Sequence, residues 1–392
     1  MAQPSHPMCS RCSCWKDKGS VYQDKCDTKE TGVARRKTNG AKDIINSYRL
    51  GEILGSGAFG VVRSATKKGE KYAIKLLSKP RLKRRRIGLR SNALELLSRE
   101  IAVWKKLNHP NICNLIEVIN DDSHEEVYLV SEFIEGGMLL PDKRVVQPME
   151  EPLARSFCRQ ILLGLEYLHA IGIAHRDIKP ANILLTERTE HGIVKLCDFG
   201  VAEMFDHENG GNSGVKNTVG TMEFFAPEMC QDGGDAFAAT LCDVWAVGVT
   251  LHMMLCGVMP AQGNSMEDLF NSIKALEVNI SKDIEAKYDA GAFVLLRGLL
   301  IRNPDERWSV ERALNSDWLN NVSAEASKLS VSSITPKKAR HTSLQINRIL
   351  VSDDEVAKAM SPMSMLTPGG TMKAIVRFNS FRGSTERVEK ER

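Results

Sequence analysis

The chain has 392 residues, of which 42% are hydrophobic, so it can bury a sizeable core and still leave room for tails. Its formal net charge of +4 is too small to indicate a nucleic-acid-binding protein. The ten cysteines follow no disulfide spacing, which indicates reduced thiols and predicts a cytoplasmic protein, with the nucleus as the alternative.

Residues 1–47 are polar and show no apolar period, so they predict a disordered tail. The start of the chain has no long apolar core of the kind that signal peptides carry, and Ala2 excludes N-myristoylation. Four early cysteines leave three readings open: a zinc site, reversible palmitoylation at a membrane, or an ordinary disordered tail. They are Cys9, Cys12, Cys14 and Cys26.

Strand-like apolar runs begin at Tyr48, and the pattern G-x-G-x-x-G-x-V occupies residues 55–62. Glycines let the backbone approach phosphate groups and present N–H donors without a Cβ in the way. Because strands flank the pattern on both sides, it favours a phosphate loop between two strands over the strand-to-helix turn of dinucleotide-binding folds.

Lys75 stands in the next strand-like run. Residues 92–107 then repeat apolar side chains at helical spacing and predict a helix, which also contains Glu100. The stretch between them, residues 79–90, is strongly basic. It leaves three readings open: a solvated face, a docking site for an acidic partner surface, or a nuclear import signal.

The string HRDIKPAN at residues 175–182 is the most specific in the chain, and DFG follows at residues 198–200. With the glycine pattern and the strand lysine, these motifs resemble the eukaryotic protein kinase family in order and spacing, over about Tyr48 to Leu319. The resemblance implies an α+β fold with a small β-rich N-lobe and a larger helical C-lobe. A kinase domain over 48–319 would then separate the disordered N-terminal tail from a flexible C-terminal tail, residues 320–392.

The resemblance implies a serine/threonine kinase that uses ATP and magnesium. Asp177 would accept the proton of the substrate hydroxyl, and Lys179, typical of this class, would stabilise the transferring phosphate. Lys75 would neutralise the ATP phosphates once Glu100 pairs with it. Two oxygen donors would hold magnesium, Asn182 and Asp198. A pseudokinase scaffold, the non-catalytic alternative, would normally have lost one of these residues.

The resemblance also implies how ATP is bound. Adenine would bond the backbone C=O of Glu132 and the backbone N–H of Ile134, beside Ser131 as a small gatekeeper residue. Cys197 is expected to be a small buried hydrophobe at the inner edge of this pocket, with a target for electrophiles as the alternative. The predicted ATP-binding residues are Leu54, Gly55, Gly57, Gly60, Val62, Ala73, Lys75, Ser131, Glu132, Ile134 and Leu184.

Further positions are expected to support the site without taking part in the chemistry. The apolar run 244–259 follows Asp243 directly and predicts a buried helix rather than a membrane span. By resemblance, Asp243 at the start of this run braces the catalytic loop. The other expected supports are Trp245, Thr221 and the pair formed by Arg307 with Glu228.

Asn217 stands where many kinases carry the activating Thr or Ser, and it cannot take a phosphate. The stretches 217–228 and 242–260 resemble the calcium/calmodulin-dependent protein kinase kinases and related upstream kinases of AMP-activated-type kinases. This implies basal activity without a phosphate at that site, and a substrate that is the activation-loop Thr of another kinase. A kinase with other substrates is the alternative. Met138 and Ala181 replace acids of many basophilic kinases, which favours docking of a folded partner over short Arg-containing peptides.

The C-terminal tail contains two stretches, residues 351–360 and 371–383, that resemble the regulatory end of the calmodulin-dependent members. In the second, Met372, Val376 and Phe381 stand among basic residues, a pattern that suits the groove of calcium-bound calmodulin. The alternative is a flexible tail with phosphorylation sites. We expect a monomer with no nucleic-acid partner and no transmembrane segment.

Overall fold

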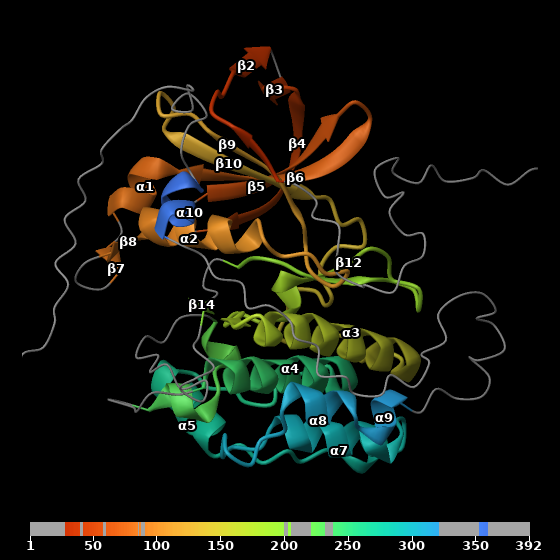
Figure 1. Ribbon diagram of the computed structural model, residues 1–392. Helices are drawn as coiled ribbons and strands as arrows, with labels where there is room; N and C mark the ends of the chain where they lie inside the picture. Colours follow the sequence, from red (N-terminus) through yellow and green to blue (C-terminus); the bar gives the residue numbers. More distant parts are fainter. Residues whose placement is uncertain are drawn as a thin grey trace, which may run out of the picture.

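The computed structural model describes residues 28–39, 42–57, 60–84, 86–87, 91–199, 203–204, 221–231, 238–320 and 353–359. A curled β-sheet with its own helices lies above a larger helical lobe (Figure 1). This arrangement confirms the predicted α+β class and the two lobes.

The upper lobe is organised by an eight-stranded sheet in the order β1-β9-β10-β6-β5-β4-β3-β2. Strand β1 pairs with β9 in parallel, and the other neighbours are antiparallel. The strands are β1 (Lys29–Thr31), β2 (Arg36–Asn39), β3 (Lys42–Ile45), β4 (Tyr48–Gly57), β5 (Gly60–Lys67), β6 (Glu70–Ser78), β9 (Leu115–Asn120) and β10 (Glu126–Glu132). Three two-stranded pairs complete the β-structure: β7 (Arg86–Ile87) with β8 (Ser91–Asn92), β11 (Ile173–Ala174) with β14 (Glu203–Met204), and β12 (Ile183–Leu185) with β13 (Val194–Leu196).

The described part of the N-terminal region differs from the predicted disordered tail, because β1, β2 and β3 belong to the main sheet. The buried carboxylate of Glu117 holds β1 in place: it accepts hydrogen bonds from Lys29 Nζ at 3.0 Å, Thr31 Oγ1 at 2.5 Å and Tyr48 Oη at 2.7 Å. The tail prediction is therefore wrong for these strands. The four early cysteines lie outside the described residues.

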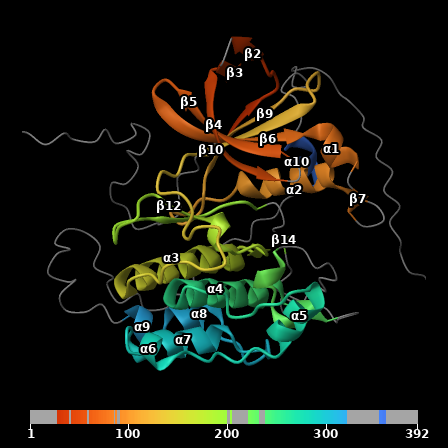
Figure 2. The ribbon, with the colours of Figure 1, turned by 180° about the vertical axis from the view of Figure 1, so that it is seen from behind.

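The helices of the upper lobe are α1 (Lys79–Arg84) and α2 (Ala93–Trp104), and α10 (Asp353–Lys358) packs against α2 (Figure 2). The lower lobe contains α3 (Glu151–Ala170), α4 (Ala239–Cys256), α5 (Met266–Lys274), α6 (Lys282–Glu285), α7 (Ala290–Leu299), α8 (Val310–Leu314) and α9 (Asp317–Asn320). Short 3-10 turns cover η1 (Pro180–Asn182), η3 (Met222–Phe224) and η4 (Pro227–Cys230).

Helix α4 forms the centre of the lower lobe. In the described part of the chain it is the one helix long and apolar enough to cross a membrane by length and composition, and 83% of it is buried inside the protein. Apolar side chains all around a helix are typical of such a core position. The helix contacts α3, α7 and β11, so a polar side chain on α4 can reach the loop that follows β11.

The ion pair between Arg307 and Glu228 locks the chain after Thr221 onto the lower lobe. The guanidinium is fully buried and binds the carboxylate through two bonds of 2.7 and 2.8 Å. It also donates to the backbone oxygens of Ile301 and Leu241. A buried pair with this many bonds costs far more to break than a surface pair, because one charge is left without a partner.

We predict that Arg307→Met lowers the free energy of unfolding by about 3–5 kcal/mol, since Glu228 then loses its buried partner. The control is Arg297→Met, which breaks a half-exposed pair with Glu285 and should cost about 1 kcal/mol or less. Urea unfolding of both variants measures the difference. Equal losses would show that the buried pair has no special weight.

Candidate active site

The loop after β11 is held by the carboxylate of Asp243, which is 1% exposed. This carboxylate accepts the backbone N–H of His175 at 2.8 Å and of Arg176 at 2.7 Å, and it contacts His169 Nε2 at 2.8 Å. Arg176 has a φ of 66°, in the left-handed region that non-glycine residues rarely adopt. The hydrogen bonds from α4 therefore hold a turn that the local sequence would not favour by itself, and Asp177 follows directly.

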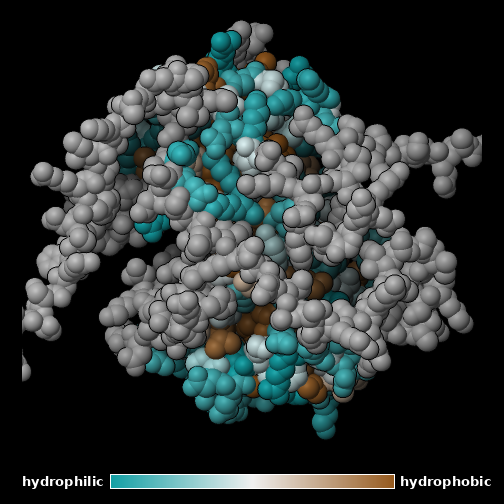
Figure 3. Space-filling model, viewed as in Figure 1, coloured by the Kyte–Doolittle hydropathy of each residue, from teal (hydrophilic) through white to brown (hydrophobic). Residues whose placement is uncertain are grey.

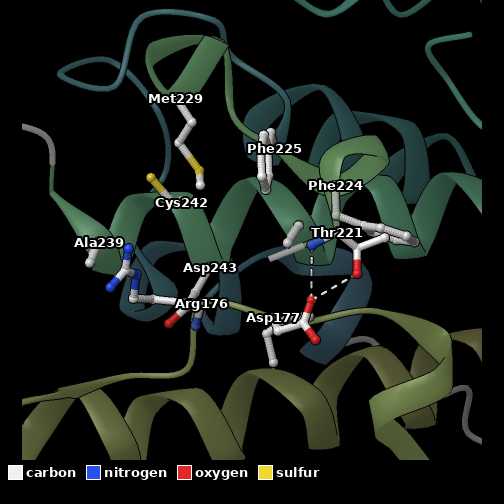
Figure 4. A pocket seen from close by; sticks show the side chains of 11 residues that line it. Arg176, Asp177, Thr221, Phe224, Phe225, Met229, Ala239, Cys242 and Asp243 are labelled. Carbon is white, nitrogen blue, oxygen red and sulfur yellow. Dashed lines mark hydrogen bonds between the residues drawn. The ribbon is translucent and has the colours of Figure 1, made fainter. Parts of the chain in front are cut away.

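The side chain of Asp177 is oriented by three residues. Thr221 donates to its Oδ1 through the backbone N–H at 3.2 Å and the hydroxyl at 3.0 Å (Figure 4). Asn182 Nδ2 donates to its Oδ2, and Lys179 Nζ contacts the same oxygen, both at 2.8 Å. Lys179 also donates to Thr221 Oγ1 at 2.6 Å. The result is a fixed carboxylate next to a fixed ammonium, which is the arrangement for taking a proton from a hydroxyl beside a transferring phosphate.

Lys75 lies near two carboxylates, those of Asp198 and Glu100. The structure pairs it with Asp198, whereas the sequence predicted Glu100 as its partner. Its Nζ donates to Asp198 Oδ1 at 2.7 Å, whereas Glu100 Oε1 has no hydrogen-bond partner among the described residues. The expected hydrogen-bonded pair of Lys75 with Glu100 is therefore not formed. The physical reason is competition, because one ammonium group faces two acids and binds the nearer carboxylate.

The electrostatics of these three groups follow from burial and mutual attraction. Burial raises the pKa of Glu100 to about 7, although the nearby Lys75 charge partly opposes this. For Lys75, burial lowers the pKa, but the Asp198 and Glu100 charges outweigh it and hold the pKa above its usual value. For Asp198, burial is likewise outweighed by Lys75, which holds that carboxyl pKa below its usual value. Near neutral pH, Asp198 is thus ionised while Glu100 is only partly so.

A contact between aromatic rings joins α2 to the catalytic loop. Phe199, 1% exposed, lies with its ring centroid 5.9 Å from that of Trp104 and 5.1 Å from that of His175. Trp104 is itself fixed by its indole N–H, which donates to the backbone oxygen of Cys113 at 2.6 Å. Sequence reasoning recognised Trp104 only as an apolar position at helical spacing and missed this role, because the partner ring lies 95 residues further along the chain.

Most of the predicted ATP-binding residues lie on strands of the two lobes. Val62 on β5 and Ala73 on β6 are half-buried, and Ser131 on β10 pairs with Ala73 in the sheet register. Leu184 lies on β12 opposite Met138, just after the inter-lobe connection. The predicted adenine-binding side chains thus come from both lobes: Val62 and Ala73 from the upper lobe and Leu184 from the lower lobe.

The glycine loop is the hairpin turn between β4 and β5, with Gly55 opposite Val62 and Gly57 opposite Gly60. A Cβ at Gly60 would lie 1.7 Å from the backbone oxygen of Leu76, so only glycine fits there. Leu54 at the start of the turn is 49% exposed. In the sheet register, Val62 after the turn lies opposite Lys75 on β6.

Cys197 is a poor candidate for covalent chemistry. The neighbouring Cys113 thiol and burial together hold the pKa of Cys197 well above its usual value. A thiol that stays protonated is a weak nucleophile, so Cys197 is better described as a small side chain, partly buried against the hydrophobic core, than as a target for electrophiles.

Two side chains fit a divalent metal ion. Asn182 uses its Nδ2 to bind the backbone oxygen and Oδ2 of Asp177, which leaves its amide oxygen without a hydrogen bond among the described residues. Asp198 offers a carboxylate that is 46% exposed. Oxygen donors of this kind suit hard cations, and two protein donors leave positions for the phosphate oxygens of a nucleotide.

Comparison with known proteins agrees with the geometry. The protein kinase domain family matches residues 48–319. The chain is 35% identical over 308 residues to a probable serine/threonine-protein kinase of Dictyostelium discoideum, a match that covers 76% of this chain and 42% of that protein. It is 33% identical over 294 residues to the serine/threonine-protein kinase GRIK1 of Arabidopsis thaliana, covering 74% of this chain and 71% of that one. It is also 37% identical over 249 residues to a calcium/calmodulin-dependent protein kinase kinase of Caenorhabditis elegans, covering 59% of this chain and 45% of the worm protein.

The raised pKa of Glu100 predicts a pH-dependent stability. Because this pKa is about 7 in the folded chain and ordinary in the unfolded chain, the folded state binds the extra proton between about pH 4.5 and 7. The stabilisation that this proton on Glu100 provides is complete below about pH 4.5 and is lost as the pH rises through 7.

Glu100→Gln removes this loss, so the variant should gain about 1–3 kcal/mol relative to the original chain between pH 5 and pH 8. Thermal unfolding of the nucleotide-free protein at both pH values measures the gain. Exposed Glu70→Gln is the matched control and should keep the original pH profile. A parallel profile for Glu100→Gln would mean that Glu100 is ionised throughout.

The small gatekeeper predicts an altered inhibitor profile. Ser131 places only a hydroxyl beside Ala73, so we expect a purine inhibitor with a bulky N6 group to bind at least tenfold more tightly to the original chain than to Ser131→Met. Inhibition curves at fixed ATP measure this ratio. Equal inhibition of the two would place residue 131 away from the N6 group.

Proposed function

Since the chain belongs to the protein kinase family and is an ATP-dependent serine/threonine kinase, we propose that its substrates are other protein kinases. Specifically, it would phosphorylate the activation-loop Thr of AMP-activated-type kinases. The observation that carries this proposal is the Asp177–Thr221–Lys179 network, which is complete in a chain that has Asn217 in place of the usual phosphorylated residue. The worm relative, a calcium/calmodulin-dependent protein kinase kinase, is by its name an enzyme of the same kind.

The catalytic step follows from the groups in place. The oxygen of the substrate hydroxyl attacks the terminal phosphorus of ATP, and Asp177 accepts the proton of that hydroxyl. ADP leaves with the electrons of the broken P–O bond. Lys179, 2.8 Å from Asp177 Oδ2, would stabilise the charge of the transferring phosphate. Lys75 moves from Asp198 to the phosphates, where Glu100 can hold it. A divalent ion, magnesium in this proposal, would be held by Asn182 and Asp198 and would neutralise phosphate charge.

Activity without a phosphate at residue 217 has structural support around that position. Thr221 is already bonded to Asp177, and Phe199 already lies against Trp104 and His175. The segment 205–220 itself lies outside the described residues. Within it, Thr218 and Ser213 carry hydroxyl groups, and we propose them as candidate phosphorylation sites. We therefore propose substantial activity in the dephosphorylated protein.

A surface next to this network suits a folded partner. A cavity of about 250 Å³ opens on the lower lobe and is lined by Arg144, Glu223, Met259, Ala261, Gln262, Gly263, Asn264 and Leu269. Figure 3 shows hydrophobic side chains gathered between α4 and α5 on this lobe. Met222 and Met266 are 44% and 58% exposed. Exposed apolar surface near the transfer site favours docking of a protein over capture of a charged peptide.

Calmodulin control is the second part of the proposal. The candidate segment 371–383 lies outside the described residues, and its support is the sequence pattern together with the calmodulin-dependent relative. Binding of calcium-loaded calmodulin to this segment would regulate the enzyme from the C-terminal side.

The test is phosphate transfer from ATP by the phosphatase-treated full-length protein to a catalytically dead AMP-activated-type kinase domain, with and without calcium-calmodulin. We expect transfer to the activation-loop Thr, stimulated by calcium-calmodulin and reduced at least a hundredfold by Asp177→Asn. A substrate with that Thr replaced by Ala is the control.

Each negative result has a separate meaning. Activity on a generic protein without transfer to this domain would favour other substrates. Equal transfer with and without calcium-calmodulin would contradict the proposed calmodulin control and would support the proposal that the substrates are other kinases. An inactive dephosphorylated enzyme that an upstream kinase restores would contradict activity without phosphorylation.

A further inference from the structure

The short C-terminal helix α10 binds the end of α2 through two lysines. Lys106 Nζ lies 2.8 Å from Glu355 Oε1 and 2.9 Å from its Oε2. Lys105 Nζ donates to the backbone oxygen of Ala359 at 3.1 Å and lies 2.6 Å from Glu30 Oε1 on β1. An N-terminal strand, the helix that carries Glu100 and a C-terminal segment therefore meet at one point.

Apolar contacts accompany these polar ones. Ala359 is only 3% exposed, and Val356 packs against the main hydrophobic core. A helix of six residues is not stable by itself in water, because so short a segment cannot offset the cost of nucleation. The helix therefore depends on the surface it covers, and both views place it along α2 (Figures 1 and 2).

The covered end of α2 is connected to the active site. The backbone N–H of Lys105 continues the helix by bonding Ile101 O at 3.0 Å, and Trp104 immediately before it contacts Phe199. Glu100 lies one turn further back on the same helix. Any shift of this end of α2 would change the Trp104–Phe199 contact and the distance between Glu100 and Lys75.

We propose that Asp353–Ala359, here called the tail strap, is a positioning element for phosphoryl transfer. It holds the C-terminal end of α2 and thereby keeps Trp104 against Phe199 and Glu100 within reach of Lys75. Its partner is the end of this chain's own helix α2. The strap binds there through the Glu355 carboxylate on Lys106, the backbone oxygen of Ala359 on Lys105, and the apolar side chains of Val356 and Ala359. The proposal rests on the kinase activity and is independent of the protein substrate and of calmodulin.

The first test reverses the charge of the ion pair in the full-length protein. Glu355→Lys and Lys106→Glu should each lower kcat on a generic protein substrate, in calcium-free buffer, by about threefold or more, with a smaller change in KM for ATP. Amide hydrogen exchange over residues 93–104 should become faster in both. The double variant restores the attraction and should recover both readouts, which a general loss of folding would not do.

The second test removes docking through the apolar contact. Ala359→Arg places a charged side chain at a buried position and should lower kcat about tenfold with faster exchange in α2. Lys358→Glu is the matched control, because Lys358 is exposed on the same helix, and it should leave both readouts unchanged.

Unchanged kcat and unchanged exchange in Glu355→Lys and Ala359→Arg would overturn the proposal. A rise in kcat would also overturn it, because the strap would then restrain the enzyme. Neither result would affect the upstream-kinase proposal, since the strap test uses a generic substrate.

Discussion

The site depends on one buried carboxylate. Asp243 is taken out of water in the centre of the lower lobe, and that cost is acceptable only because its oxygens are fully used. Two backbone N–H groups and an imidazole satisfy it. In return, it fixes the left-handed turn at Arg176 and with it the direction of the following Asp177. The catalytic carboxylate therefore depends for its orientation on Asp243, a residue that stands 66 positions later in the chain.

A second constraint is the shortage of positive charge beside the ATP phosphates. One ammonium, that of Lys75, serves two carboxylates, and the bond to Asp198 leaves the buried Oε1 of Glu100 without a hydrogen-bond partner among the described residues. Burial makes the charge on Glu100 costly, while Lys75 lowers that cost when it turns toward Glu100. In the proposed mechanism, Lys75 therefore leaves Asp198 for the phosphates and for Glu100 when phosphate charge arrives.

The sequence was sufficient to predict those parts of the site whose functional residues stand close together in a short motif. The glycine turn, Lys75, the catalytic loop and DFG could be located because each role needs particular residue types at short spacing. Prediction from the sequence failed where a feature depends on contacts between residues that are far apart along the chain. Strand β1 is short and polar, and it is held by Glu117, which no local pattern indicates. The partner of Lys75 and the ring contact of Trp104 are likewise decided by three-dimensional proximity.

Contacts of this kind also hold the first and last described segments of the chain, strand β1 and the segment Asp353–Ala359, against the upper lobe. Strand β1 covers the β9 edge of the main sheet, where unpaired backbone groups would otherwise be exposed. Glu30 on that strand and Ala359 after α10 share the ammonium of Lys105. Segments that composition assigns to tails thus converge on the helix that carries Glu100. A kinase whose catalytic helix is held from both ends of the chain can be controlled at either end without any change to the catalytic loop.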